Sequence, residues 1–456
     1  MNHPGTRRSA RTPSVVGAHL VQAATSLVLH LLAARRLGTT GLAEFATIAS
    51  GLVVVGAVTV ALVCDPLTML TPATPEARAG LGCWALMIAV GAAVAGVVGG
   101  LAIVDGEDGD TELVALSVGA GAGLVAVTEV LRRAAALRGR LTTVTVVDLA
   151  GAGTAILFAL RAAPTLRSLV EAVIVGRLVT LVLVTLVLLA PPTVLAMHRH
   201  PRNAHRGRHP RARILQRADL SSVWRVGRWR LAQHTLRPAM WTVLRLLAIA
   251  SAGPAAWGAV ETARLAVAPA MVMTNGVGAA LFVSMATDRS PTPDQRRRQA
   301  RRAAATALVL QLAAVTLSLL ALSVVAAFAG PATDVTRHDA RARVKVAAVA
   351  LAGWSALAAA TAAALPAGVL ASTGGAPAAP ARNRATEVGA TLAGAAILLA
   401  LDAPPVIVPW LAAASTGVAG RRLWRAETQR SGAQRSETQR SGATASPPGA
   451  TPGGAP

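Results

Sequence analysis

Twelve stretches of mostly apolar residues recur along the chain, separated by shorter polar or charged segments. An apolar helix of about 20 residues spans the roughly 30 Å hydrocarbon core of a bilayer, because each helical residue adds about 1.5 Å. The pattern therefore predicts twelve transmembrane helices. They cover residues 14–34, 43–64, 82–104, 113–131, 141–160, 168–190, 231–250, 256–283, 303–328, 346–370, 386–401 and 404–419.

The composition supports the same fold class. Of the 456 residues, 53% are hydrophobic and only 14% are charged, and the mean hydropathy is +0.53. A soluble domain carries about 25% charged residues. These values exclude an ordinary soluble enzyme and indicate an all-α polytopic membrane protein.

The distribution of positive charge predicts how the helices are oriented. Lys and Arg number 44 against 21 Asp and Glu, which gives a net charge of +23. With both termini on the cytoplasmic side, the inner segments hold 32 of these cations and the outer segments hold 8. This asymmetry follows the rule that cytoplasmic loops are rich in Lys and Arg. The basic excess therefore points to anionic membrane lipids as partners and not to nucleic acid.

An internal repeat divides the predicted helices into two sets of six. When the chain is shifted by 215 residues, residues 28–47 align with residues 243–262 without a gap and with seven identities, including Gly38 with Gly253. A shift of six helices keeps both halves in the same orientation, which is the parallel-repeat arrangement of some transporters. The sequence thus predicts two six-helix lobes.

The predicted organisation has five parts. These are a cytoplasmic N-terminal tail (1–13), a first lobe (14–190), a basic cytoplasmic linker (191–230), a second lobe (231–419) and a cytoplasmic C-terminal tail (420–456). The tail repeats the seven residues of 427–433 at 437–443 and ends in Pro, Gly and Ala, so we expect it to be disordered. The linker contains four histidines but one carboxylate and no cysteine, so we expect no metal site and no cofactor.

Charged residues inside the predicted helices are the candidate functional residues, because each costs about 2.5–3.5 kcal/mol at the centre of a membrane. Arg237, Trp241 and Arg245 are spaced by four and share one helix face, beside Pro238. Arginine binds phosphate through paired hydrogen bonds, so this stripe could bind a pyrophosphate group in a cavity between the lobes. The candidate substrate-binding residues are Arg177, His234, Arg237, Trp241, Arg245 and Arg264.

Three acids inside the predicted helices, Asp148, Glu171 and Glu261, are candidates to bind a coupling proton or cation. The alternative is that these acids pair with the arginines and hold helices together. Arg245 could instead extend to the membrane surface, and His234 could lie at the inner interface. No set of residues suited to acid–base or nucleophilic chemistry occurs, so we expect neither catalytic residues nor an enzyme.

The segment Leu32–Phe45, which joins the first two helices, resembles a recurrent segment of bacterial polysaccharide flippases. Its leucine–glycine pair at Gly38 is followed by Gly41 and an aromatic residue, and residues 252–259 repeat the feature in the second half. Ala43, where the second half has Gly258, departs from the pattern. The chain is therefore similar, over residues 14–419, to the polysaccharide branch of the multidrug/oligosaccharidyl-lipid/polysaccharide (MOP) exporter superfamily.

The resemblance implies a V-shaped pair of lobes, like that of the multidrug and toxin extrusion (MATE) proteins, that alternates between inward-open and outward-open states. It also implies a flippase that moves an undecaprenyl-pyrophosphate-linked oligosaccharide across the cytoplasmic membrane of a bacterium for cell-surface polysaccharide biosynthesis. Basic cavity residues would bind the anionic carrier, a role open here to Arg177, Arg237 and Arg264.

Two other functions stay open. The first is a cation-coupled multidrug exporter of the same superfamily, which would need an acidic site for organic cations. The second is a membrane scaffold without transport activity that recruits glycosyltransferases or a polymerase through residues 191–230 and the C-terminal tail. The net basic character of the candidate cavity residues argues against a cationic substrate.

Overall fold

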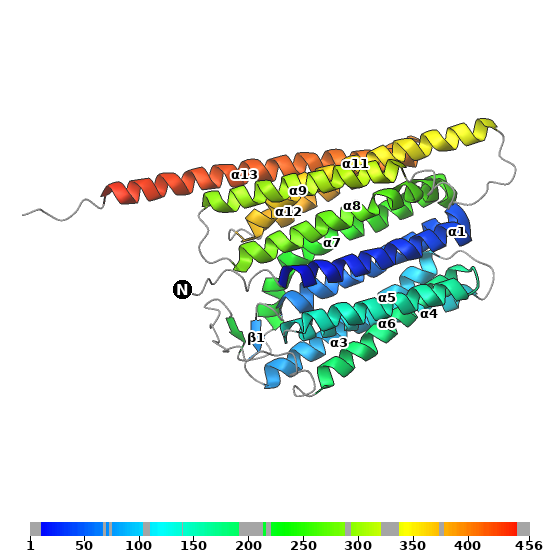
Figure 1. Cartoon of the computed structure of the whole chain (residues 1–456), viewed down its shortest axis with the longest axis horizontal. Helices are drawn as coiled ribbons and strands as arrows, with labels where there is room; N and C mark the ends of the chain where they lie inside the picture. The colour runs from blue at the N-terminus through cyan, green and yellow to red at the C-terminus, as the bar shows by residue number, and fades with distance from the viewer. Residues whose placement is uncertain are drawn as a thin grey trace, which may run out of the picture.

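The computed structural model describes residues 11–66, 70–72, 75–103, 110–138, 140–190, 213–215, 220–287, 293–320, 337–373 and 378–444. In this part of the chain the structure is a bundle of long helices that run roughly side by side (Figure 1). Helices from the first half of the sequence form one side of the bundle and helices from the second half form the other.

Within the described residues, the first lobe contains five long helices, a short π-helix and one short strand. They are α1 (Arg11–Thr59), η1 (Val60–Cys64), β1 (Leu70–Pro72), α3 (Pro75–Ile103), α4 (Asp110–Leu137), α5 (Leu141–Arg161) and α6 (Leu166–Leu189). Helix α1 is broken at Gly38, where φ is 67°, so it contains two of the predicted membrane spans.

The second lobe follows the linker. The linker contributes β2 (Arg213–Leu215), and the second lobe contains α7 (Leu220–Ala252), α8 (Pro254–Thr287), α9 (Pro293–Leu320), α11 (Arg337–Thr373), α12 (Ala378–Ala400), η3 (Pro405–Ile407) and α13 (Val408–Thr444). With α1 counted as two segments, every one of the twelve predicted spans overlaps a helix. The predicted all-α, twelve-segment fold is therefore confirmed.

Six helical stretches in the described ranges are long and apolar enough to cross a membrane: 24–64, 79–102, 111–135, 142–161, 166–189 and 345–372. Their outward side chains are apolar, as on α3 and α6, where Leu86 and Leu189 are 63% and 75% exposed. Such a surface suits contact with lipid. The chain is a multi-pass membrane protein.

The two breaks that follow the first helix of each lobe have the same backbone geometry. Gly38 and Gly253 have φ angles of 67° and 81°, and they are the positions that the internal repeat superimposes. Residues with a side chain rarely adopt such angles, which explains a glycine at each position. At Gly258 a Cβ atom would lie 2.0 Å from the carbonyl oxygen of Thr39, so here the two lobes meet backbone to backbone.

Each lobe completes the hydrophobic core of the other. Ala43 of the first lobe is fully buried in the core of the second lobe, beside Trp257 and Trp354. Leu265 of the second lobe is buried in the first-lobe core beside Phe45.

Two boundaries differ from the prediction. Helix α7 begins at Leu220, so the last eleven residues of the predicted linker are helical; Val223 is buried there, and Gly227 packs against Ala61. Arg213–Leu215 pairs in parallel with Leu70–Pro72. The rest of the linker, with its four histidines, lies outside the described residues.

The C-terminal tail is the second difference. We expected disorder from residue 420, but α13 continues to Thr444. The Ala, Arg, Glu and Gln residues of 420–444 favour helix, and this stretch contains no proline. Arg297 of α9 also donates to the backbone carbonyls of Glu427 and Thr428, at 3.0 Å each. Residues 445–456 lie outside the described part.

Candidate functional site

A cavity of about 280 Å³ lies between the lobes, lined by α1 on one side and by α7, α8 and α11 on the other. We call it the inter-lobe cavity. Its polar lining includes Ser50, Arg237, Arg245, Arg264 and Thr361. Among the described residues that line it there are three arginines and no carboxylate, so its surface is basic.

Two of these arginines share one buried acid. Glu261 is fully buried, and the Nε of Arg245 lies 2.6 Å from its Oε1. The Nε of Arg264 donates to the other oxygen, Oε2. One carboxylate thus balances two guanidinium groups, and an excess of positive charge remains beside the cavity. The predicted alternative, pairing between arginine and acid, holds for Arg264 and Glu261. Arg245 does not extend to the membrane surface, as its own alternative had it, because it is buried against the same acid.

Aromatic and hydroxyl groups fix α7 in place around the cavity. The rings of Trp241 and Trp354 contact each other at an angle of 34° with their centroids 4.7 Å apart, and the indole of Trp354 donates to the carbonyl of Val260 at 3.0 Å. The hydroxyl groups of Ser50 and Thr242 lie 2.8 Å apart and join the two lobes. Trp241 therefore lines the cavity as part of a packed wall.

A second cavity, of about 380 Å³, lies within the first lobe. We call it the N-lobe cavity. Arg132 contacts its two acids, Glu129 at 2.7 Å and Asp148 at 2.6 Å. Arg177 also lines this cavity, and no ion pair involves it in the described chain. His30 lies between the N-lobe cavity and the inter-lobe cavity, because it lines both.

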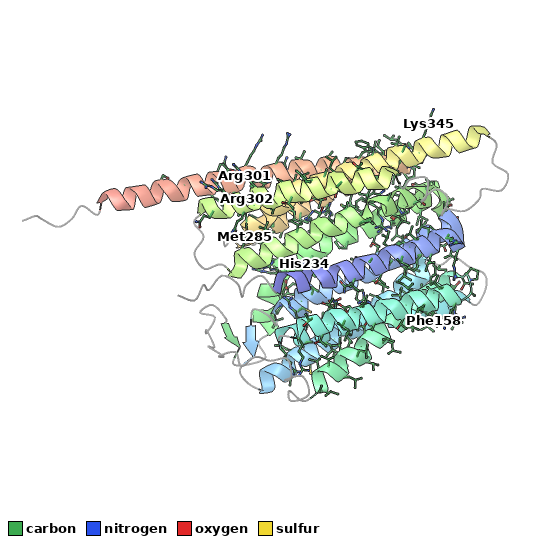
Figure 2. All side chains as sticks on the ribbon, in the orientation of Figure 1. Phe158, His234, Met285, Arg301, Arg302 and Lys345 are labelled. Atoms are coloured by element: carbon green, nitrogen blue, oxygen red, sulfur yellow. The ribbon has the colours of Figure 1, made fainter. Side chains whose placement is uncertain are left out.

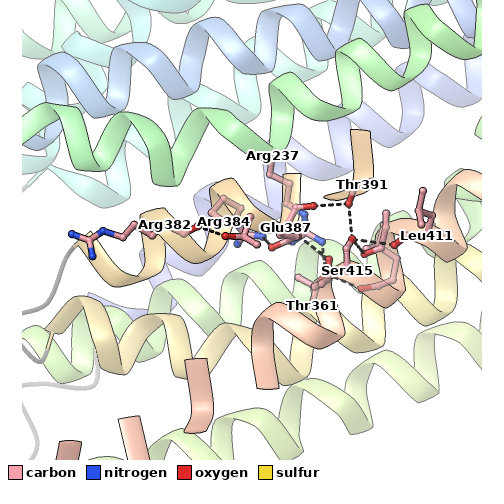
Figure 3. A network of polar contacts seen from close by, with 12 residues as sticks. Arg237, Thr361, Arg382, Arg384, Glu387, Thr391, Leu411 and Ser415 are labelled. Atoms are coloured by element: carbon pink, nitrogen blue, oxygen red, sulfur yellow. Dashed lines mark hydrogen bonds and ion pairs between the residues drawn. The ribbon is translucent and has the colours of Figure 1, made fainter. Parts of the chain in front are cut away.

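A third cavity, of about 270 Å³, lies within the second lobe among α7, α11, α12 and α13. We call it the C-lobe cavity. Its charged lining comprises Arg230, His234, Arg237, Arg384 and Glu387. Figure 3 shows Arg237, Arg384 and Glu387 directed toward the same polar network, while Arg382 points away from it.

An ionic junction joins the lobes at the end of α1 that we predict to be cytoplasmic. Asp65 lies 3.3 Å from His234 and 3.8 Å from Arg230 of the second lobe, and 3.6 Å from Arg133 of its own lobe. Burial acts to raise the pKa of Asp65. The hydrogen bond from His234 and the charges of His234, Arg230 and Arg133 outweigh burial, so the pKa lies below its ordinary value.

The structure brings together three of the predicted substrate-binding arginines and places the others elsewhere. Arg237, Arg245, Arg264 and Trp241 line the inter-lobe cavity. His234 lines the C-lobe cavity, and Arg177 lines the N-lobe cavity. By contrast, Figure 2 shows Arg301, Arg302 and Lys345 pointing away from the bundle.

The three predicted coupling acids have different surroundings. Asp148 lines the N-lobe cavity, and Glu261 is enclosed by two arginines. Glu171 pairs with Arg167 at 2.8 Å on a half-exposed face and lines none of the three cavities described above. Asp148 is therefore the best-placed of the three to exchange a proton or cation with a cavity.

Sequence reasoning missed Asp65, Arg384 and Glu387. Asp65 follows directly after a predicted span, so it looked like an ordinary helix-end residue. The spacing of Arg384 and Glu387 is a helical ion-pair spacing that could have drawn attention. That Glu387 is also bonded by Thr416 at 2.8 Å depends on packing between helices, which spacing alone does not reveal.

Comparison with known proteins identifies structures that share this fold. No protein-family model and no curated protein matches the sequence. An inward-facing multidrug resistance MATE family transporter of the MOP superfamily is similar in structure, with TM-score 0.61, 14% identity, and coverage of 91% of this chain and 99% of that one. An outward-facing MATE family transporter gives TM-score 0.58, 14% identity and coverage of 92% and 94%.

A third similar structure is a MOP superfamily transporter from Pyrococcus furiosus, described as having a binding pocket of reverse polarity that suggests a different function. It gives TM-score 0.60 and 14% identity, with coverage of 92% of this chain and 94% of that chain. At this identity the likeness concerns the fold. The chain is thus a multi-pass membrane protein with the fold of the MATE transporters of the MOP superfamily.

Proposed function

We propose that the protein is an alternating-access transporter that moves a lipid-linked oligosaccharide, carried on undecaprenyl pyrophosphate, across the cytoplasmic membrane of a bacterium. Its fold resembles both inward-facing and outward-facing transporters, which supports alternating access. The two lobes share a repeat and enclose a cavity at their interface, where transporters built from repeats bind substrate.

The proposed substrate is chosen from the basic lining of the inter-lobe cavity. Arg237, Arg245 and Arg264 line it, and no described lining residue is acidic. Guanidinium groups suit the planar, two-point binding of phosphate oxygens. A pyrophosphate group would bind here while its lipid tail stays in the membrane. An organic cation would meet repulsion, so the multidrug-exporter alternative is disfavoured.

In the similar transporter from Pyrococcus furiosus, the reverse polarity of the binding pocket suggests a different function. By the same reasoning, the basic inter-lobe cavity favours an anionic substrate in this protein.

For energy coupling we assign Asp148, because it is the predicted coupling acid that faces a cavity. Its ion pair with Arg132 would open when Asp148 takes up a proton. Glycosyltransferases or a polymerase of the same pathway are the partners we expect.

Native mass spectrometry of the full chain tests the substrate. The protein is titrated with undecaprenyl-pyrophosphate sugar and with a neutral lipid of equal length. We expect selective adducts with the anionic lipid and at least a tenfold loss, about 1.4 kcal/mol, in an Arg237→Gln/Arg264→Gln variant. The matched control is Arg301→Gln/Arg302→Gln, which removes two outward-pointing arginines.

Equal binding of the two lipids, or equal loss in both variants, would refute this substrate. Arg264→Gln leaves Glu261 paired with Arg245, so the variant keeps the buried acid neutralised. A folding defect is therefore distinguishable, since thermal unfolding of the variant in detergent should match that of the control.

A further inference from the structure

The inter-lobe cavity and the C-lobe cavity meet at one pair of residues. Arg237 and Thr361 line both cavities, and the Nη2 of Arg237 donates to the hydroxyl oxygen of Thr361. The Thr361 hydroxyl in turn donates to the carbonyl of Leu357 at 2.8 Å, which fixes its direction. The linings of the two cavities therefore share the Arg237–Thr361 contact.

The C-lobe cavity carries more positive than negative charge. Arg230, Arg237 and Arg384 line it with Glu387 as the one described carboxylate in its lining. Both oxygens of Glu387 are engaged: Arg384 Nη1 lies 2.6 Å from Oε2, and the Thr416 hydroxyl donates to Oε1 at 2.8 Å. Glu387 therefore neutralises no more than one of the lining arginines, namely Arg384.

Arg237 is left without a counter-ion in the described chain. Its guanidinium group contacts the neutral hydroxyl of Thr361 and forms no ion pair there. The guanidinium of Arg230 shares the carboxylate of Asp65 with His234 and Arg133. A partly enclosed guanidinium without a counter-ion is unfavourable in a membrane unless an anion binds it.

Neutral donors and space complete an anion site. The amide of Asn383 lines the same cavity and offers further N–H groups. Its volume of about 270 Å³ far exceeds the roughly 30 Å³ that one water occupies, which leaves room for a phosphate or pyrophosphate group.

We propose that the C-lobe cavity is a second anion-binding site, which takes a phosphate-class group through Arg384 and Arg237. The bound group would then pass into the inter-lobe cavity when Arg237 exchanges Thr361 for phosphate oxygens on its other side. The identity of the group as a lipid carrier rests on the proposed function; the anion site itself does not.

Isothermal titration of the full chain in phosphatidylcholine nanodiscs, with inorganic pyrophosphate as the probe, tests the site. Arg384→Gln should weaken binding at least about tenfold, because it removes a charged donor. Arg382→Gln, on an exposed turn of the same helix, should bind like the parent chain. Equal affinity of the Arg384→Gln variant and the parent chain overturns the proposal.

Arg384→Gln leaves Glu387 buried without its cation, so a second variant serves as a control for misfolding. Arg384→Gln/Glu387→Gln removes both charges and leaves the net charge unchanged. We expect the same loss of pyrophosphate affinity, which then comes from the missing guanidinium group. If the double variant binds pyrophosphate like the parent chain, the Arg384 site is wrong.

The same variants, titrated with undecaprenyl-pyrophosphate sugar, separate this inference from the proposed function. If pyrophosphate binding depends on Arg384 but the lipid does not bind, the anion site stands and the flippase proposal fails. If the lipid binds through Arg264 and neither ligand depends on Arg384, the flippase proposal stands and the C-lobe site is overturned. Failure of both ligands to bind overturns both.

Discussion

The arginines inside the bundle differ in what their guanidinium groups contact. Arg245 and Arg264 bind one acid, Glu261, whereas Arg237 contacts a neutral hydroxyl and Arg177 faces a cavity. The sequence places these residues inside membrane helices and on shared faces. The i,i+3 spacing of Glu261 and Arg264 is compatible with their ion pair. Spacing does not reveal that Arg245 on another helix shares this acid, or that Arg237 contacts a neutral hydroxyl.

Glu261 should be important for stability. Replacing it with glutamine leaves Arg245 and Arg264 without their acid, and breaking a buried ion pair costs about 3–5 kcal/mol. We expect Glu261→Gln to lower the thermal unfolding temperature in detergent clearly. Glu171→Gln is the matched control, because the half-exposed Glu171–Arg167 pair contributes about 1 kcal/mol or less. Equal unfolding temperatures would contradict the assigned trio.

At the scale of helices, every segment predicted from hydropathy overlaps a helix, and six helical stretches of the described residues are long and apolar enough to cross a membrane. The repeat also placed Gly38 opposite Gly253, and both have positive φ angles. The boundaries that failed depend on contacts between distant segments. The start of α7 packs on residues around Ala61, and the extension of α13 is held by Arg297.

The contact between α1 and α8 at Gly258 should tolerate no side chain. A Cβ atom in Gly258→Ala would clash with the carbonyl of Thr39, and relieving such a clash costs about 1–3 kcal/mol. Gly389→Ala is the control, because nothing lies within 4 Å of a Cβ atom there and alanine favours helix. Thermal unfolding should show a loss for the first variant and no loss for the second.

At the scale of the whole molecule, Asp65 ties the lobes together at the predicted cytoplasmic end. Asp65→Asn should weaken this junction and open the lobes there more often. A cysteine at Ala61, in a Cys64→Ser/Cys83→Ser background, reports this opening, because Ala61 is buried against α7. We expect maleimide to label it severalfold faster in the Asp65→Asn variant.

Asp65→Glu should label more slowly than Asp65→Asn, because it keeps a carboxylate among Arg230, His234 and Arg133. Labelling that is unchanged by Asp65→Asn would show that the junction does not hold the lobes together.

The carboxyl group of Asp65 should not titrate in the physiological pH range. The pKa of Asp65 lies below its ordinary value, so its carboxylate stabilises the junction above an ordinary pKa of about 3.9 and loses this effect as pH falls through the lowered pKa. Labelling at residue 61 should therefore show no carboxyl titration between about pH 5 and 8. A carboxyl titration in that range that Asp65→Asn abolishes would contradict this assignment.

The exchange of core residues between the lobes has a consequence for biosynthesis. The first lobe leaves the ribosome before Leu265 has been made, so its core lacks one buried side chain until α8 enters the membrane. The second lobe, in turn, needs Ala43 to complete its core and cannot finish packing alone. We therefore expect each half-chain to be degraded when it is expressed alone. The two half-chains should accumulate only when they are co-expressed from separate messages.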